Sequence, residues 1–598
     1  MRFLTSRLSI LLCLAPMAMA PAAAAAQDVQ LDVSGGNDGL RQTLQAASLT
    51  LSLEESGGGA AQDFVAAARA DYRRLLTGLY SEGYYGGTIS ITVDGIEASQ
   101  LDPLIPRNTV SRVILSVTPG PRFTFGRADI APLAPGTILP EAFATGQIAR
   151  ASVIGDAAST AVNGWRAVGR PLAATTDQSI TARHPDQQLD AVVTVAPGPE
   201  LTFGAITVEG NEAVRSERIL AIAGIPAQVY DPALVNRAEE NLRRTGAFSS
   251  ATVLEGDAPD GTTLPLTISV VEQTPRRIGA GAEFSSVSGL TLSGYWLHRN
   301  LLGGAERFRI DGEITGLSGG TGGIDYSLGT SFLRPASYRQ DTDTYVNATI
   351  EQLDEPSYFQ RDVALETGRI RRIRDDVVLE YGIGYTAGQV SDDLGDRNYS
   401  LFYLPLEGTM DRRDDAFDAK NGYYANLQIA PFLGLNGTDS GARMVGDGRI
   451  YRSFGTDDRV TLAARGQLGA VLGADAGNIP SSYLFYSGGG GTVRGQAYQS
   501  LGVDLGGGNE IGGATFIGAQ LEARVGVTDK IGVVGFYDTG FVGADEFALT
   551  GGDWHAGAGL GLRYDTGIGP IRLDVAVPTT GANAGEAIEV YIGIGQSF

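Results

Sequence analysis

Residues 589–598 read E-V-Y-I-G-I-G-Q-S-F, an alternating segment that ends on an aromatic residue. Because successive side chains of a strand point to opposite faces, one face is expected to carry the apolar residues Val590, Ile592, Ile594 and Phe598. A strand with no polar tail can pair with another strand along its edge. Outer-membrane β-barrels close in this way, by pairing their last strand with their first. The segment therefore predicts the end of a barrel, with an ordinary soluble strand as the alternative.

The other end of the chain reads as a secretion signal over residues 1–26. A positive n-region precedes a short apolar core at residues 8–14, and small residues stand before Gln27. The apolar core is too short to span a bilayer as a helix. Removal of the signal also removes Cys13, so the mature chain would hold no cysteine, which suits an oxidising compartment. Signal and barrel end together predict the outer membrane of a Gram-negative cell.

The composition fits a multidomain membrane protein and disfavours a nucleic-acid partner. A chain of 598 residues is long for one soluble domain. Without Arg2 and Arg7 of the signal, 43 basic residues face 68 acidic residues, a net charge of −25. Phosphate backbones require a basic surface, so we expect no nucleic acid. No later segment is apolar over the roughly 20 residues that a membrane helix needs, so any span must be a closed barrel.

The first half of the chain contains an internal repeat. Residues 118–126 read T-P-G-P-R-F-T-F-G, and residues 196–204 read A-P-G-P-E-L-T-F-G. Prolines at 119, 197 and 275 stand 78 residues apart, each after a predicted strand. Because proline cannot donate to a strand ladder, each one marks the place where pairing stops. The spacing predicts three similar units ahead of the barrel.

Each unit is expected to follow the order β-α-α-β-β. The third unit shows it best, with predicted elements at 203–208, 216–223, 232–244, 248–253 and 264–271. The first unit repeats it at 29–33, 40–47, 63–80, 88–93 and 113–117, and the middle unit has a predicted helix near 161–168. This order resembles that of POTRA domains. The open sheet edge of such a module can accept an extended strand of a client, with plain spacers as the alternative.

The chain is thus predicted to combine α+β POTRA repeats with a transmembrane antiparallel β-barrel. Division of the second half by the length of a membrane strand and its connection gives about 16 strands. The predicted boundaries are a signal peptide over 1–26, POTRA units over 27–118, 119–196 and 197–274, and a barrel over 275–598.

Four motifs in the second half carry a family resemblance. They are S-G-G-G-G-T-V-R-G-Q at 487–496, F-Y-D-T-G at 536–540, G-L-G-L-R-Y-D-T-G-I-G-P-I-R-L-D-V-A-V-P at 559–578, and D-R-R-D at 411–414 ahead of K-N-G-Y at 420–423. As a set they resemble the BamA/TamA superfamily of outer-membrane insertases and translocators. Three POTRA-like units and this length are most similar to the TamA group. The resemblance covers nearly the whole mature chain.

The resemblance implies a functional loop inside the barrel. Its tip would be formed by Val493, Arg494, Gly495 and Gln496, folded back into the lumen. The matching motif on the inner wall consists of Phe536, Asp538 and Gly540. An arginine in a partly dehydrated lumen needs a carboxylate partner, so Arg494 would pair with Asp538 and pin the loop. Gln496 replaces the aromatic residue usual at its position, and a surface arginine in a mobile loop is the alternative.

The resemblance also implies a weak seam between the first and last strands. The last strand would contribute Val590, Ile592, Gly593, Ile594, Gly595 and Phe598. Gly593 and Gly595 add little side-chain packing. An open seam would let a client strand pair inside the bilayer, so that its backbone never crosses lipid unsatisfied. Gln596 stands where the C-terminal β-signal of such proteins usually has an apolar residue.

The implied function is insertion or export of β-rich clients, such as nascent outer-membrane proteins and autotransporters, in contact with outer-membrane lipid. The first POTRA unit would bind a TamB-like, inner-membrane-anchored periplasmic protein. We expect no cofactor, metal or enzymatic activity, because His184, His298 and His555 are far apart in sequence and no nucleophile elbow or cysteine cluster occurs. The alternatives are a two-partner secretion pore, which usually has two POTRA units, a BamA-like general insertase, which usually has five, and a passive porin.

Overall fold

The computed structural model describes residues 28–598 apart from 103–104, 106, 108, 286–288, 318–321, 456–457, 548–549, 567–568 and 582–583. The predicted signal peptide lies outside the described residues. The chain divides into two compact units. One holds the first two α+β domains with short segments of the third, and the other holds most of the third domain together with the C-terminal sheet.

The first domain packs its helices on a mixed sheet. The sheet order is β1-β4-β2-β3, with β1 parallel to β4 and β2 antiparallel to it. Apolar helix residues such as Leu40, Phe64 and Leu79 are fully buried against the sheet. The elements are β1 (Asp28–Val33), α1 (Asp38–Ala47), α2 (Leu49–Glu55), α3 (Ala61–Ser81), β2 (Thr88–Val93), β3 (Ile96–Glu97) and β4 (Arg112–Thr118).

Helix α2 was not predicted, and a buried carboxyl group explains it. Its sequence, L-T-L-S-L-E-E, alternates as a strand would. Ser48 caps the helix by accepting from Leu51 N at 3.2 Å. The side chain of Asp71, on α3, is fully buried and accepts hydrogen bonds from Leu49 N at 2.8 Å and from Thr50 N at 3.1 Å. It also accepts from the hydroxyls of Ser48 and Thr50, so α3 holds the first turn of α2 in place.

The second and third domains are three-stranded. In the second, β5 (Thr124–Ala131) pairs in parallel with β7 (Gln188–Ala196), and β6 (Ala174–Arg183) lies on the other side of β7. Its helix α4 (Ala151–Ala167) begins ten residues earlier than predicted and is the only α-helix in this described domain, so the prediction of β-α-α-β-β for this unit is wrong and its order is β-α-β-β. In the third, every predicted element is present: β8 (Thr202–Glu209), α5 (Ser216–Ala223), α6 (Pro232–Arg244), β9 (Phe248–Glu255) and β10 (Thr263–Glu272), in the sheet order β8-β10-β9.

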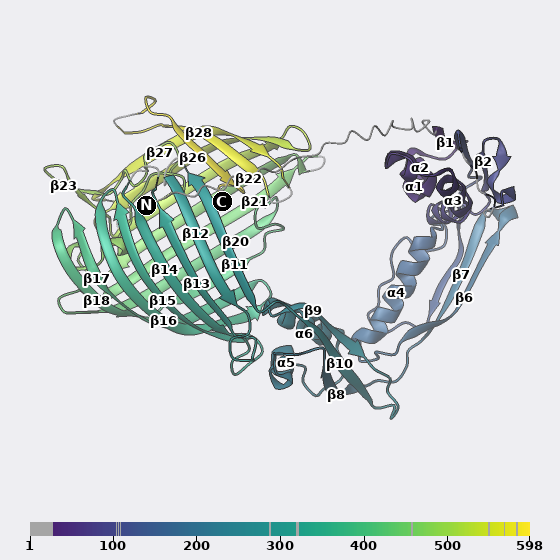
Figure 1. The fold of residues 1–598 in the computed structure, drawn as a ribbon, viewed down its shortest axis with the longest axis horizontal. Helices are drawn as coiled ribbons and strands as arrows, with labels where there is room; N and C mark the ends of the chain where they lie inside the picture. Colours follow the sequence, from purple (N-terminus) through teal and green to yellow (C-terminus); the bar gives the residue numbers. More distant parts are fainter. Residues whose placement is uncertain are drawn as a thin grey trace, which may run out of the picture. The chain divides into compact units, whose positions relative to one another are not determined.

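The C-terminal sheet runs antiparallel in sequence order and curls into a barrel (Figure 1). It has seventeen segments among the described residues, but β18 and β19 both pair with β17 on one side and β20 on the other. They form one strand interrupted at Leu404 and Pro405, so the segments fill sixteen strand positions and the prediction of about 16 is confirmed. The segments are β11 (Arg276–Ser285), β12 (Gly289–His298), β13 (Arg307–Thr315), β14 (Asp325–Arg334), β15 (Thr342–Glu355), β16 (Tyr358–Arg374), β17 (Val377–Asp392), β18 (Gly395–Tyr403), β19 (Leu406–Asp411), β20 (Gly422–Leu435), β21 (Gly441–Phe454), β22 (Val460–Leu472), β25 (Thr515–Gly526), β26 (Ile531–Gly543), β27 (Gly552–Tyr564), β28 (Ile571–Pro578) and β29 (Glu589–Ile594).

The two faces of this sheet differ in polarity. On β25, Gln520 and Glu522 point inward and are buried, whereas Leu521 between them is 56% exposed on the outer face. Outward-facing apolar residues recur on the other strands, as in Leu462 and Leu560. An apolar outside and a polar lumen are the pattern of a membrane barrel. Separately, none of the helices in the described part of the chain is long and apolar enough to cross a membrane.

We expect Asp71→Ala to loosen the first domain. The change removes the acceptor of four hydrogen bonds and leaves buried donors of Ser48 and Thr50 unsatisfied, at a cost of about 2–4 kcal/mol. Hydrogen–deuterium exchange of the full-length chain should show faster exchange in α2. Asp38→Ala is the control, because Asp38 is exposed in the first turn of α1 and contributes at most about 1 kcal/mol. Unchanged protection of α2 in Asp71→Ala would contradict this role.

Candidate functional site

The connection between β22 and β25 enters the lumen instead of staying outside. It is held by paired backbone hydrogen bonds between Phe485 and Gly513 at 2.8 and 2.9 Å, and between Ser487 and Leu501 at 2.9 and 3.0 Å. Apolar residues on this loop pack against apolar residues of the inner wall: Ile479, Leu484 and Phe485 with Phe432, Phe516 and Val542. We refer to residues 484–502 as the lumen loop.

The tip of the lumen loop places a buried arginine among three carboxylates. Arg494 is 1% exposed. Its Nε and Nη2 donate to the two oxygens of Asp538 at 2.7 and 2.9 Å, and its backbone N donates to the same carboxylate at 3.1 Å. Nη1 donates to Glu522 at 2.6 Å and to Asp574 at 3.3 Å. The guanidinium lies 3.6 Å from the centre of the Phe536 ring, so three strands (β25, β26 and β28) hold one side chain.

The three carboxylates are balanced by three arginines. Glu522 also pairs with Arg524 at 2.8 Å, and Asp574 also pairs with Arg563. All six side chains are largely or fully buried. Buried charges are tolerated when each has a partner of opposite sign, and each of these six side chains has one, although Nη2 of Arg563 has no hydrogen-bond partner among the described residues. Sequence reasoning placed Asp538 beside Arg494, and the structure brings them together; it missed Glu522 and Asp574, although Asp574 lies within the motif at 559–578.

Glycines on the loop and on the wall allow this close approach. Gly495 has a φ of +91°, and a Cβ there would lie 2.6 Å from the carbonyl oxygen of Val577. A Cβ on Gly557 would lie 1.9 Å from the carbonyl oxygen of Arg494. Gly540, from the predicted wall motif, likewise makes room for Ser487, whose hydroxyl is 2.7 Å from Nε2 of His555. These positions exclude any larger side chain.

Three further contacts fix the tip. Val493 is fully buried. The backbone N of Gly495 donates to the hydroxyl of Tyr591 on β29 at 3.0 Å, which ties the loop to the last strand. Gln496, which replaces an aromatic residue, donates from Nε2 to the carbonyl oxygens of Ala556 at 2.8 Å and Thr580 at 3.1 Å. The amide thus anchors the tip through hydrogen bonds in place of ring packing.

The prediction that Phe598 shares a face with Val590, Ile592 and Ile594 is wrong. Those three residues are exposed on the outer face, whereas Phe598 is buried in the lumen. Strand β29 ends at Ile594 because Gly595 has a φ of +88°, which turns the following residues inward.

Residues 596–598 contact the inner wall of the barrel. The Phe598 ring lies 6.4 Å from that of Tyr451 on β21, and Arg524 donates to the Phe598 carbonyl oxygen at 3.1 Å. Gln596 accepts from Nε of Arg563 and donates to Asp418, both at 2.8 Å. Since Arg524 and Arg563 also hold the carboxylates around Arg494, the turn after β29 and the lumen loop share one charge network.

Among the described residues, strand β29 has a ladder on one side. It pairs with β28 from Ile571↔Ile594 to Ala576↔Glu589. The Cα traces of β29 and β11 come within 8 Å of each other, yet no ladder joins the two strands in the residues that the structure describes. Gly593 lies within β29, and a Cβ added to it would lie 3.0 Å from Nε of Arg572. The predicted seam residues therefore lie on a strand for which the described residues show a ladder with β28 and none with β11.

Comparison with known proteins identifies the barrel. The Omp85 superfamily domain matches residues 300–598, which is half of the chain. The chain belongs to the Omp85 superfamily. A POTRA domain, described as a surface antigen variable number repeat, matches residues 201–273. Membership of the Omp85 superfamily places the barrel in the outer membrane and the POTRA domains in the periplasm.

Three solved structures align with this chain. BamA from Haemophilus ducreyi lacking POTRA domains 1–3 aligns with a TM-score of 0.61 at 17% identity, over 79% of this chain and 99% of that chain. CdiB from Acinetobacter baumannii aligns with a TM-score of 0.49 at 11% identity, over 79% and 89%. CdiB from Escherichia coli aligns with a TM-score of 0.47 at 14% identity, over 79% and 90%. At these identities the BamA likeness is evidence of the fold alone.

In this Omp85 protein the third POTRA domain rests directly on two periplasmic turns of the barrel. Arg215, ahead of α5, donates from its backbone N to Gly303 O at 3.0 Å and from Nη1 to Leu302 O at 2.6 Å. Arg218 donates from Nη2 to Pro335 O at 2.6 Å. Both arginines bind backbone carbonyls, so the junction depends on the positions of the turns more than on their side chains.

We expect Arg494→Ala to release the lumen loop. Three buried carboxylates would then share two arginines, and an uncompensated buried charge costs about 3–5 kcal/mol. The temperature of the heat-modifiable mobility shift should fall, and proteases should cut within 484–502. Arg494→Lys keeps the charge but loses the two-pronged contact with Asp538, so an intermediate result is expected.

Arg459→Ala is the matched control for this prediction, because Arg459 is an exposed barrel arginine. It should behave as the wild type in both assays. If Arg494→Ala also keeps the wild-type shift temperature and protease resistance, the loop is not held by this network.

Proposed function

We propose that this protein assists the insertion or export of β-rich outer-membrane clients, such as autotransporters, in the manner of the TamA group. The observation that carries the proposal is the contrast between a lumen loop held by buried charges and a last strand with one ladder partner among the described residues. The lumen loop is fixed by the buried charges around Arg494, whereas β29 has a ladder with β28 alone among the described residues. A strand edge inside the bilayer is the site at which a client strand can satisfy its backbone without crossing lipid exposed.

The number of periplasmic modules supports this group over its relatives. Three α+β domains precede the barrel in the described residues, where a two-partner secretion pore usually has two and a BamA-like insertase usually has five. Of the three domains, the first is farthest from the barrel in the sequence. In this proposal it binds a TamB-like, inner-membrane-anchored periplasmic protein that brings clients across the periplasm.

The proposal involves no catalytic step, cofactor or metal. Folding of the client supplies the free energy, because each strand that pairs at the seam exchanges an unsatisfied edge for a hydrogen-bonded one.

The second candidate is a two-partner secretion pore, which would export one exoprotein through the lumen. The buried network around Arg494 disfavours it, since the loop would first have to break six charged contacts to open that route.

The partner can be tested by photo-crosslinking in intact cells. A photoreactive residue at Gln45, exposed on α1, should capture a large inner-membrane-anchored periplasmic protein. The matched control is Asp257, exposed between β9 and β10 of the third domain, which should not capture it. Recovery of one secreted exoprotein at both positions would contradict the proposal and favour the two-partner secretion class.

A further inference from the structure

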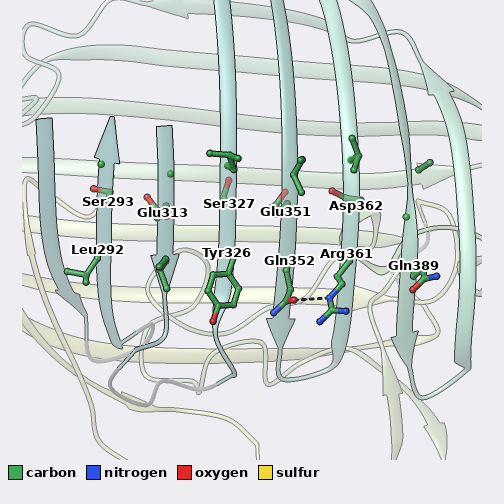
Figure 2. A pocket seen from close by; sticks show the side chains of 18 residues that line it. Leu292, Ser293, Glu313, Tyr326, Ser327, Glu351, Gln352, Arg361, Asp362 and Gln389 are labelled. Atoms are coloured by element: carbon green, nitrogen blue, oxygen red, sulfur yellow. Dashed lines mark hydrogen bonds between the residues drawn. The ribbon is translucent and has the colours of Figure 1, made fainter. Parts of the chain in front are cut away.

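The outer face of the barrel has a groove of about 820 Å³ across strands β12–β17 (Figure 2). Its exposed apolar side chains include Leu328, Ile350 and Val363, which are 50, 57 and 54% exposed. These residues face one another in register, Leu328↔Ile350 and Ile350↔Val363. The neighbouring acidic residues Glu351 and Asp362 pair with each other in the alternate register, so their side chains belong to the lumen face. The groove therefore opens toward lipid.

Two glycines deepen one end of the groove. Gly294 on β12 faces Gly312 on β13, and Gly312 faces Leu328 on β14. A Cβ added to either glycine would meet no heavy atom closer than 3.8 Å. Packing within the protein therefore does not require glycine here. The space lies outside the sheet, where only the surrounding lipid can fill it.

A polar row borders the groove on one side. In register across β14–β17 stand Tyr326, Gln352, Arg361 and Gln389, and Figure 2 shows them along one line. Arg361 donates from Nε to Oε1 of Gln352 at 2.8 Å and lies 4.8 Å from the centre of the Phe359 ring. Within the described residues it forms no ion pair with a carboxylate. A guanidinium at a lipid-facing position without a protein carboxylate is complementary to an anionic headgroup.

The position of Arg361 along β16 places it at the outer leaflet. It lies three residues after Tyr358, where β16 begins at the end of the barrel away from the third POTRA domain. Arg369 lies on the same face eight residues further on, 4.3 Å from the centre of the Tyr338 ring, at the periplasmic end. Eight residues of a tilted strand rise by about 20 Å, close to the height of the apolar band of such barrels. The two arginines thus mark the two headgroup levels.

We propose that this groove binds one phosphorylated glycolipid of the outer leaflet, with an acyl chain over Gly294 and Gly312 and a headgroup phosphate on Arg361. Gln352 and Gln389 supply further hydrogen-bonding groups beside that phosphate. Arginine matches phosphate because its planar fork can donate two parallel hydrogen bonds. The site lies on β12–β17, next to the first strand β11, so the bound lipid would stabilise the strands on the β11 side of the seam.

Native mass spectrometry of the full-length protein in detergent micelles can test this site. The probes are a bis-phosphorylated, hexa-acylated glucosamine disaccharide, the same lipid without phosphates, and inorganic phosphate. We expect the wild type to retain one molecule of the phosphorylated lipid, and to bind it about tenfold more tightly than Arg361→Gln does, because one charged hydrogen-bonded contact is lost. The wild type should bind the dephosphorylated lipid as weakly as Arg361→Gln binds the phosphorylated lipid.

Two further variants separate the acyl chain from the headgroup. Gly312→Phe fills the groove without a steric conflict inside the sheet and should also weaken binding of the phosphorylated lipid, while the heat-modifiable mobility shift stays at its wild-type temperature. Arg369→Gln is the control at the other end of the same strand and should bind as the wild type does. The proposal would be overturned if the wild type retained the phosphorylated and dephosphorylated lipids equally. It would also be overturned if the wild type and Arg361→Gln retained the phosphorylated lipid equally. Displacement of the lipid by inorganic phosphate would overturn the acyl-chain part.

Discussion

One buried arginine organises the inner side of this barrel. Arg494 cannot lose its proton in a protein, so once it is inside the lumen its charge must be matched there. Asp538, Glu522 and Asp574 match it, and they in turn need Arg524 and Arg563. Because Arg524 and Arg563 also bind residues 596–598, a single network connects the lumen loop, three wall strands and the turn after the last strand.

In the role proposed above, the seam is the place where the barrel would change. Strands β25–β28 are joined by continuous ladders and by the charges around Arg494, whereas β29 has one ladder partner among the described residues. Tyr591 connects that strand to the loop through Gly495. An assembly factor requires this distribution, because the wall must keep its shape while one edge accepts a foreign strand. On the periplasmic side, Arg215 and Arg218 join the third POTRA domain to the barrel turns.

Local patterns in the sequence predicted those parts of the fold that depend on local preference. The helix over Ser216–Ala223 and the repeat of the sheets follow from periodicity and spacing, whereas the pairing of Arg494 with Asp538 was implied by the family resemblance. Helix α2 was missed because its leucines alternate as in a strand, and a carboxyl group 21 residues away decides its form. The inward turn at Gly595 was missed because a positive φ is not visible in an alternating sequence, and the roles of Glu522 and Asp574 depend on the register of distant strands.

The central claim is that clients pair at the seam, and site-specific photo-crosslinking tests it most directly. Ile592 on β29 and Leu365 on β16 are both lipid-facing and nearly equally exposed, at 51 and 55%. With a photoreactive residue at each position in turn, cells assembling a β-rich outer-membrane client should yield a crosslink to the client's terminal strand at Ile592 and none at Leu365. Equal capture at both positions, or no capture at Ile592 while the client is assembled, would contradict the account.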